Sequence, residues 1–206
     1  MKATLLRLLA VFSTLPLFSA RSQTVVTFDD INVALTPGYA TNIPSGYQGL
    51  SWSNFWVVNS ILEFNSGYMD GYYYGMVSPS NVAFNASGNP AEIDSATNFN
   101  FLSVYLTGAW NSNLNIEVEG FNGAQEIYNT IVVASATNPT LFTFNYLDID
   151  RLYFDSYGGE PAFGGSSRTA FAMDNFAFEF IPEPSSLLLT IVGALTLLAC
   201  RKRRAA

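Results

Sequence analysis

The chain has 206 residues, of which 15% are aromatic and only 12% carry a formal charge, and it contains one Cys and no His. This length fits one domain with appendages, and an apolar fraction of 49% is enough for a packed core. The lack of His excludes Ser-His-Asp and Cys-His catalytic groups and His-ligated zinc or haem, and a single Cys excludes an intrachain disulfide.

Charge is distributed unevenly along the chain. Residues 23–181 contain two arginines and fifteen carboxylates, a formal charge of −13, whereas the other basic residues lie at the two ends. A body with this charge repels nucleic-acid phosphates, so the sequence predicts no nucleic-acid partner. It attracts cations instead, and calcium suits an oxygen-rich surface.

Residues 1–22 are predicted to be a secretory signal peptide. Positive charge at the start is followed by an apolar run from Leu5 to Phe18. Small residues at Ala20 and Ser22 fit cleavage before Gln23, because signal peptidases accept only small side chains at those two positions. The alternative is a buried N-terminal helix, which a proline inside the apolar run disfavours.

Residues 23–181 are predicted to be an all-β ectodomain, a β-sandwich or jelly roll of about eight to ten strands, because short alternating segments are separated by Gly, Asn, Ser and Pro. The expected strands are Thr24–Phe28, Gly49–Trp52, Phe55–Asn59, Val82–Phe84, Phe99–Thr107, Leu114–Phe121, Gln125–Val133, Thr140–Tyr146, Arg151–Phe154 and Ala170–Phe180. Asn122-Gly123 predicts a hairpin turn, and a change of phase at Asp174-Asn175 predicts a bulge.

Residues 182–206 consist of three consecutive segments. The motif Pro182-Glu183-Pro184 is followed by an apolar stretch, residues 185–200, and by a basic cluster, residues 201–204. A helix over the apolar stretch would span roughly 21–24 Å, so it needs a locally thinned bilayer to serve as a short transmembrane helix. The basic cluster predicts that the C-terminus stays cytoplasmic while the body is exported.

This tail resembles the PEP-CTERM sorting signal of exported proteins in Gram-negative bacteria. The resemblance implies that an exosortase, a membrane protease-transpeptidase, cuts at Pro182-Glu183-Pro184. The protein would then pass from an intermediate anchored in the inner membrane to the cell surface or the extracellular space. A permanent single-pass anchor is the alternative. Residues 108–123, 139–144 and 173–176 make the body loosely similar to galactose-binding-like jelly-roll domains, which often carry this tail, and that similarity implies no ligand site.

Asp29, Asp30, Asp174 and Asn175 are predicted to form a calcium site. The two aspartates at 29 and 30 end the first expected strand, and the other two residues lie in the last one. Because the terminal strands of a jelly roll often pair, these oxygens are expected to meet, and carboxylates with backbone carbonyls are calcium ligands. Alternatively, the residues form a turn and a bulge that hydrogen-bond the backbone. Apart from calcium, no cofactor is predicted.

Tyr68, Tyr72, Tyr73 and Tyr74 are predicted carbohydrate-binding residues. Exposed aromatic faces stack on sugar rings, and consecutive residues of a strand cannot all face inward. The alternative is packing in the core together with a Tyr-rich, Gly-punctuated hairpin. The nearby tryptophans at 52, 56 and 110 are expected in the core.

Glu117 and Glu119 share one face of an expected strand, at a spacing that would suit the two acids of a glycosidase. Alternating acids on a strand usually form its solvated face, so no catalytic residue is assigned and the protein is predicted not to be an enzyme. The first hypothesis is a structural or adhesive component of the cell surface or biofilm matrix. The second is a carbohydrate-binding module that binds extracellular polysaccharide, and the last is a glycoside hydrolase.

Overall fold

The computed structural model describes residues 22–163 and 168–181. The predicted signal peptide, residues 1–22, lies outside this part except for its last residue, and the predicted sorting tail, residues 182–206, lies wholly outside it. No helix in the described part is long and apolar enough to cross a membrane.

Twelve strands, all in antiparallel pairs, dominate the described residues, which confirms the all-β prediction. They are β1 (Thr24–Val26), β2 (Ala40–Asn42), β3 (Ser51–Ser53), β4 (Phe55–Asn59), β5 (Asn81–Asn85), β6 (Ala91–Gly108), β7 (Asn111–Ser112), β8 (Leu114–Asn122), β9 (Gln125–Ala134), β10 (Thr140–Tyr157), β11 (Glu160–Pro161) and β12 (Phe171–Phe180). Two short helices, α1 (Ser60–Asn65) and α2 (Gly71–Tyr74), lie between β4 and β5, and 3-10 turns cover Pro37–Tyr39, Tyr47–Gly49 and Ala86–Gly88.

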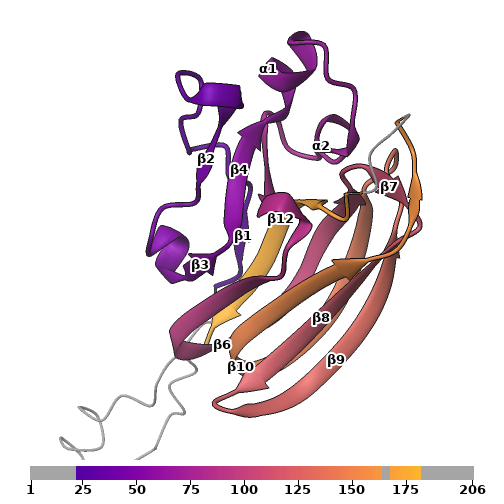
Figure 1. Cartoon of the computed structure of the whole chain (residues 1–206). Coiled ribbons are helices and arrows are strands. Elements are labelled where there is room, and N and C mark those ends of the chain that lie inside the picture. The colour runs from indigo at the N-terminus through magenta and orange to yellow at the C-terminus, as the bar shows by residue number, and fades with distance from the viewer. Residues whose placement is uncertain (1–21, 164–167, 182–206) are drawn as a thin grey trace, which may run out of the picture.

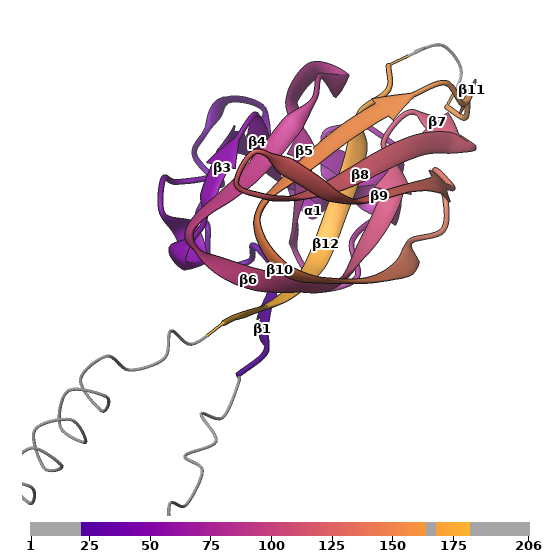
Figure 2. The ribbon, with the colours of Figure 1, turned by 90° about the horizontal axis from the view of Figure 1, so that it is seen from below.

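The long strands β6 and β10 belong to both layers of a β-sandwich (Figures 1 and 2). The second half of β6 and the first half of β10 join β2, β4, β5 and β12, and β1 pairs with β12. The other halves join β3, β8 and β9 in a five-stranded layer. The pairing of β6 with β10 shifts register repeatedly between Thr143 and Arg151, where Asn145 and Asp148 adopt positive φ. These irregularities let one continuous strand pass from one layer into the other.

The core fills the space between the two layers. On β8, Leu114, Ile116 and Val118 are fully buried, and the acids that alternate with them face outward. This is the period-two pattern that the sequence predicts. Aromatic rings dominate the rest of the core; for example, the Phe101 and Phe176 rings stack with centroids 4.9 Å apart.

Candidate carbohydrate-binding end of the sandwich

The segment Tyr68–Tyr74 ends in a helix, and not in the hairpin of the alternative interpretation. The side chain of Asp70 starts α2, because its Oδ1 accepts hydrogen bonds from the backbone N–H groups of Tyr72 at 3.0 Å and Tyr73 at 3.4 Å. Asn59 starts α1 in the same way, accepting from Leu62 at 2.9 Å. Both are preferred N-cap residues, which is the sequence signal that could have predicted these helices.

Helix α2 lies directly against the end of β6, and a glycine makes this possible. The backbone N–H of Gly71 donates to the carbonyl of Ala109 at 2.8 Å. A Cβ on Gly71 would lie only 1.9 Å from the carbonyl oxygen of Gly108. Only a residue without a side chain therefore fits at this contact.

The four predicted tyrosines have three different environments. Tyr72 is buried between Phe84 and Trp110, with ring centroids 5.0 and 5.9 Å away, so its ring is part of a second, smaller core. Tyr73 and Tyr74 are half-buried, and Tyr68 is 57% exposed. Tyr72 is therefore not available for stacking on a ligand.

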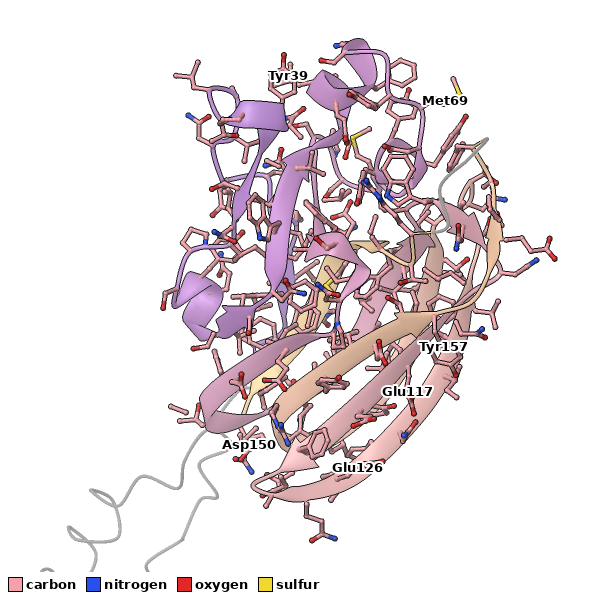
Figure 3. The ribbon with its side chains drawn as sticks, in the orientation of Figure 1. Tyr39, Met69, Glu117, Glu126, Asp150 and Tyr157 are labelled. Carbon is pink, nitrogen blue, oxygen red and sulfur yellow. The ribbon has the colours of Figure 1, made fainter. Side chains whose placement is uncertain are left out.

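Two ring pairs and the exposed tyrosine form what we call the aromatic end, defined by Phe64, Tyr68, Tyr73, Tyr74 and Phe163. Tyr73 stacks on Phe64 with centroids 4.1 Å apart, and Tyr74 stacks on Phe163 with centroids 5.8 Å apart and planes within 5°. Met69, which is 56% exposed, lies in the same region, beside the two helices at one end of the sandwich (Figures 1 and 3).

Two carboxylates that the sequence reasoning missed lie beside these rings. Asp70 is 1% exposed and its Oδ2 has no hydrogen-bond partner, and Oε2 of Glu63 is likewise buried without a partner. Burial and the nearby charge of Asp70 raise the pKa of Glu63 to about 8, and burial also raises the pKa of Asp70. The sequence signal that could have indicated a buried carboxyl is the single Glu in the apolar stretch Ile61–Phe64.

Asp174 and Asn175 occupy a bulge in β12, as the alternative interpretation of these residues predicts. Oδ2 of Asp174 accepts from the backbone N–H groups of Val77 and Ser78, both at 2.7 Å, and its Oδ1 accepts from the Ser78 hydroxyl at 2.9 Å. Asn175 has a positive φ of 50°, and the register with β6 shifts after Asp174. The fully buried Asp174 thus fixes the segment before β5.

The predicted pairing of the terminal strands is confirmed, since β1 pairs with β12, but Asp29 and Asp30 contact other segments. Asp29 accepts from the backbone N–H of Asn81 at 2.9 Å, and Asp30 accepts from the Tyr47 hydroxyl. Over residues 22–163 and 168–181, no group of three or more His, Cys, Asp or Glu side chains could hold a metal ion. Asp29, Asp30 and Asp174 are therefore not gathered into one such group.

Glu117 and Glu119 lie on the outer face of the five-stranded layer, as their alternation on β8 predicts. Glu117 accepts from the Asn129 side chain at 2.8 Å, and Figure 3 shows it on the same layer as Tyr157. Burial and the neighbouring carboxylates Glu126 and Glu117 raise the pKa of Glu119. Glu117 and Glu119 are therefore part of a charged outer face of the sheet.

Comparisons with known proteins give only distant structural similarity. No family model matches the chain, and no curated protein matches it. A solved structure of a DUF4465 family protein from Bacteroides ovatus superposes over 77% of this chain and 99% of its own, with 10% identity and a TM-score of 0.48. The carbohydrate-binding module TmCBM61, solved with β-1,4-galactotriose, superposes over 68% of this chain and 95% of its own, with 10% identity and a TM-score of 0.34. Both TM-scores lie below 0.5, and the candidate site rests on its own contacts.

Proposed function

We propose that the body binds a neutral extracellular polysaccharide through the aromatic end. The observation that carries this proposal is the clustering of partly exposed rings from α1, α2 and the segment before β12 at one end of the sandwich. Sugar rings present C–H faces that pack on aromatic rings. The two ring pairs hold their orientation before a ligand arrives, which lowers the entropic cost of binding.

The charge of the body favours an uncharged polymer. Residues 23–181 carry a formal charge of −13 and no Lys, so a polyanion would be repelled at long range. Each sugar contact is expected to be weak, and firm retention then requires many copies of the protein on one surface.

Tyr68 and Tyr74 are expected to contribute directly to polysaccharide binding. One aromatic contact is worth about 0.5–1.5 kcal/mol, which is about 2–10-fold in affinity. The double variant Tyr68→Ala/Tyr74→Ala should therefore bind about 10-fold more weakly, measured by affinity electrophoresis in gels that contain a panel of neutral polysaccharides.

Tyr157→Ala is the matched control, because Tyr157 is 42% exposed but lies on the outer face of the five-stranded layer. It should bind as the unchanged chain does. Equal retardation of the double variant and the unchanged chain would contradict the proposed site. Failure of every polysaccharide to retard the unchanged chain would favour a purely structural role.

We also propose that the protein is exported and sorted to the cell surface by an exosortase-type enzyme. This rests on the sequence alone, on the order of the motif Pro182-Glu183-Pro184, the apolar stretch 185–200 and the basic cluster 201–204. A structural or adhesive role in the surface layer and polysaccharide binding are compatible, since a sorted binding protein would attach polymer to the surface.

Mature protein recovered from the cell surface is expected to end near residues 182–185. The reason is that cleavage at the motif removes the apolar stretch and the basic cluster. Intact-mass spectrometry measures the end directly, and a variant with Pro182→Ala and Pro184→Ala should accumulate uncut in the membrane fraction. Recovery only of chains that end at Ala206 would leave the tail as a permanent anchor.

A further inference from the structure

We propose that a calcium ion binds between α1 and α2, held by the carboxylates of Glu63 and Asp70. This site is distinct from the one that the sequence predicted at Asp29, Asp30, Asp174 and Asn175. It does not depend on polysaccharide binding.

Asp70 provides the first ligand. Its Oδ1 already accepts two backbone hydrogen bonds at the start of α2, which holds the carboxylate in place. The residue is only 1% exposed, and its Oδ2 has no hydrogen-bond partner. A buried carboxylate oxygen without a partner is costly, and native proteins satisfy such atoms with a donor, a water or a cation.

Glu63 provides the second ligand from the neighbouring helix. Its Oε2 is also buried without a partner, and α1 contacts α2. After burial, the charge of Asp70 is the second cause that raises the pKa of Glu63, which is the direction expected of a neighbouring like charge. One cation between them would satisfy both of these oxygens.

Ser60 adds a third oxygen on the same side of α1. It lies three residues before Glu63, which places both side chains on one face of the helix. The residue is completely buried, and its hydroxyl oxygen has no partner. A water satisfies single atoms, whereas one cation would bind all three oxygens and would displace the proton that the raised pKa of Glu63 keeps on this carboxyl at neutral pH.

The chemistry of this donor set selects calcium. Carboxylates and a hydroxyl are hard oxygen ligands, and calcium accepts six to eight such oxygens, waters included, in irregular geometry. Magnesium requires nearly ideal octahedral geometry and keeps its waters, so it fits two helices of fixed position less well. Two protein carboxylates are also enough to balance one divalent ion.

The test uses the full chain, purified in detergent and stripped with a chelator. Calcium alone is then added, and binding is measured by titration calorimetry and by the melting temperature. One ion per chain should bind, and calcium at a hundredfold excess over its Kd should raise the melting temperature by about 5–10 °C. Magnesium at the same concentration should raise it less.

Glu63→Gln and Asp70→Asn each remove one charge at nearly constant size, and Asn still serves as an N-cap. Both variants should lose the heat of calcium binding and the rise in melting temperature, with an unchanged far-UV circular dichroism spectrum. Asp29→Asn should keep both. The proposal is overturned if the unchanged chain binds no calcium, as two carboxyls that share one proton would predict. It is also overturned if Glu63→Gln still binds, or if Asp29→Asn alone abolishes binding.

Discussion

Replacement of Asp174 by Ala should lower the free energy of unfolding by about 3 kcal/mol or more. Its carboxylate accepts two backbone N–H groups and one hydroxyl from Val77 and Ser78, and it also accepts the N–H of Asn175. Hydrogen bonds to a charged group are worth about 1.5–3 kcal/mol each, and donors left without partners add a desolvation penalty. Urea denaturation of the variant and the unchanged chain measures the difference.

Asp30→Ala is the matched control for Asp174→Ala. Asp30 is exposed and accepts a hydrogen bond from one side chain, that of Tyr47, so its loss should cost less than about 1 kcal/mol. Equal losses for the two variants would show that the contacts of Asp174 with Val77 and Ser78 do not stabilise the fold.

The same residue should make stability depend on pH. Burial raises the pKa of Asp174 to about 6, although four donors oppose this shift. The folded chain then holds this proton more tightly than the unfolded chain, in which Asp titrates near about 4. The extra stability that comes from protonation of Asp174 is therefore full below pH of about 4 and is lost as pH rises through about 6, whereas the hydrogen bonds to its carboxylate remain. Asp174→Asn should remove this slope from the pH profile.

Gly71→Ala is expected to separate α2 from the sandwich. The added Cβ would meet the carbonyl oxygen of Gly108 at 1.9 Å and the Cα of Ala109 at 2.7 Å, and both are backbone atoms that cannot rotate away. Overpacking of this kind costs about 1–3 kcal/mol or more. Tyr72 would leave its place between Phe84 and Trp110, so polysaccharide binding should fall together with the melting temperature.

Gly123→Ala is the control for Gly71→Ala, because it introduces backbone strain without a steric clash. Gly123 has a positive φ of 59° in the turn between β8 and β9, and a Cβ there would have no atom within 4 Å. Its substitution should cost about 1 kcal/mol through strain alone, and it should leave polysaccharide binding unchanged. If Gly71→Ala were no more destabilising than Gly123→Ala, this result would contradict the close contact between α2 and the end of β6.

Local sequence patterns were sufficient to predict those features of the fold that neighbouring residues determine. The alternation of apolar and acidic residues predicted which side of β8 faces the core, and Asn122-Gly123 predicted the hairpin that joins β8 to β9. The change of phase at Asp174-Asn175 predicted the bulge in β12. Each of these features depends on turn chemistry or on a period of two over a few residues.

Features that depend on distant residues were not predictable in this way. The sequence predicts two strands, Thr140–Tyr146 and Arg151–Phe154, but β10 is one strand because β6 pairs with it on both sides of the bend. The proximity of Glu63 to Asp70 likewise results from the packing of α1 on α2. Asp174 points to the segment before β5 and not to Asp29, which only the tertiary structure reveals.

Under the proposed attachment through the segment after Ile181, the course of β12 sets the distance between the tether and the aromatic end. Its first residues lie beside α2, where a Cβ on Gly75 would approach Ala172, and its last residues pair with β1 at the opposite end of the sandwich (Figure 1). Ten extended residues cover about 30 Å. A chain tethered through the segment after Ile181 would thus hold its rings about 30 Å beyond the tether. A dense layer of such chains would form a coat whose outermost surface is aromatic and whose base carries the attachment.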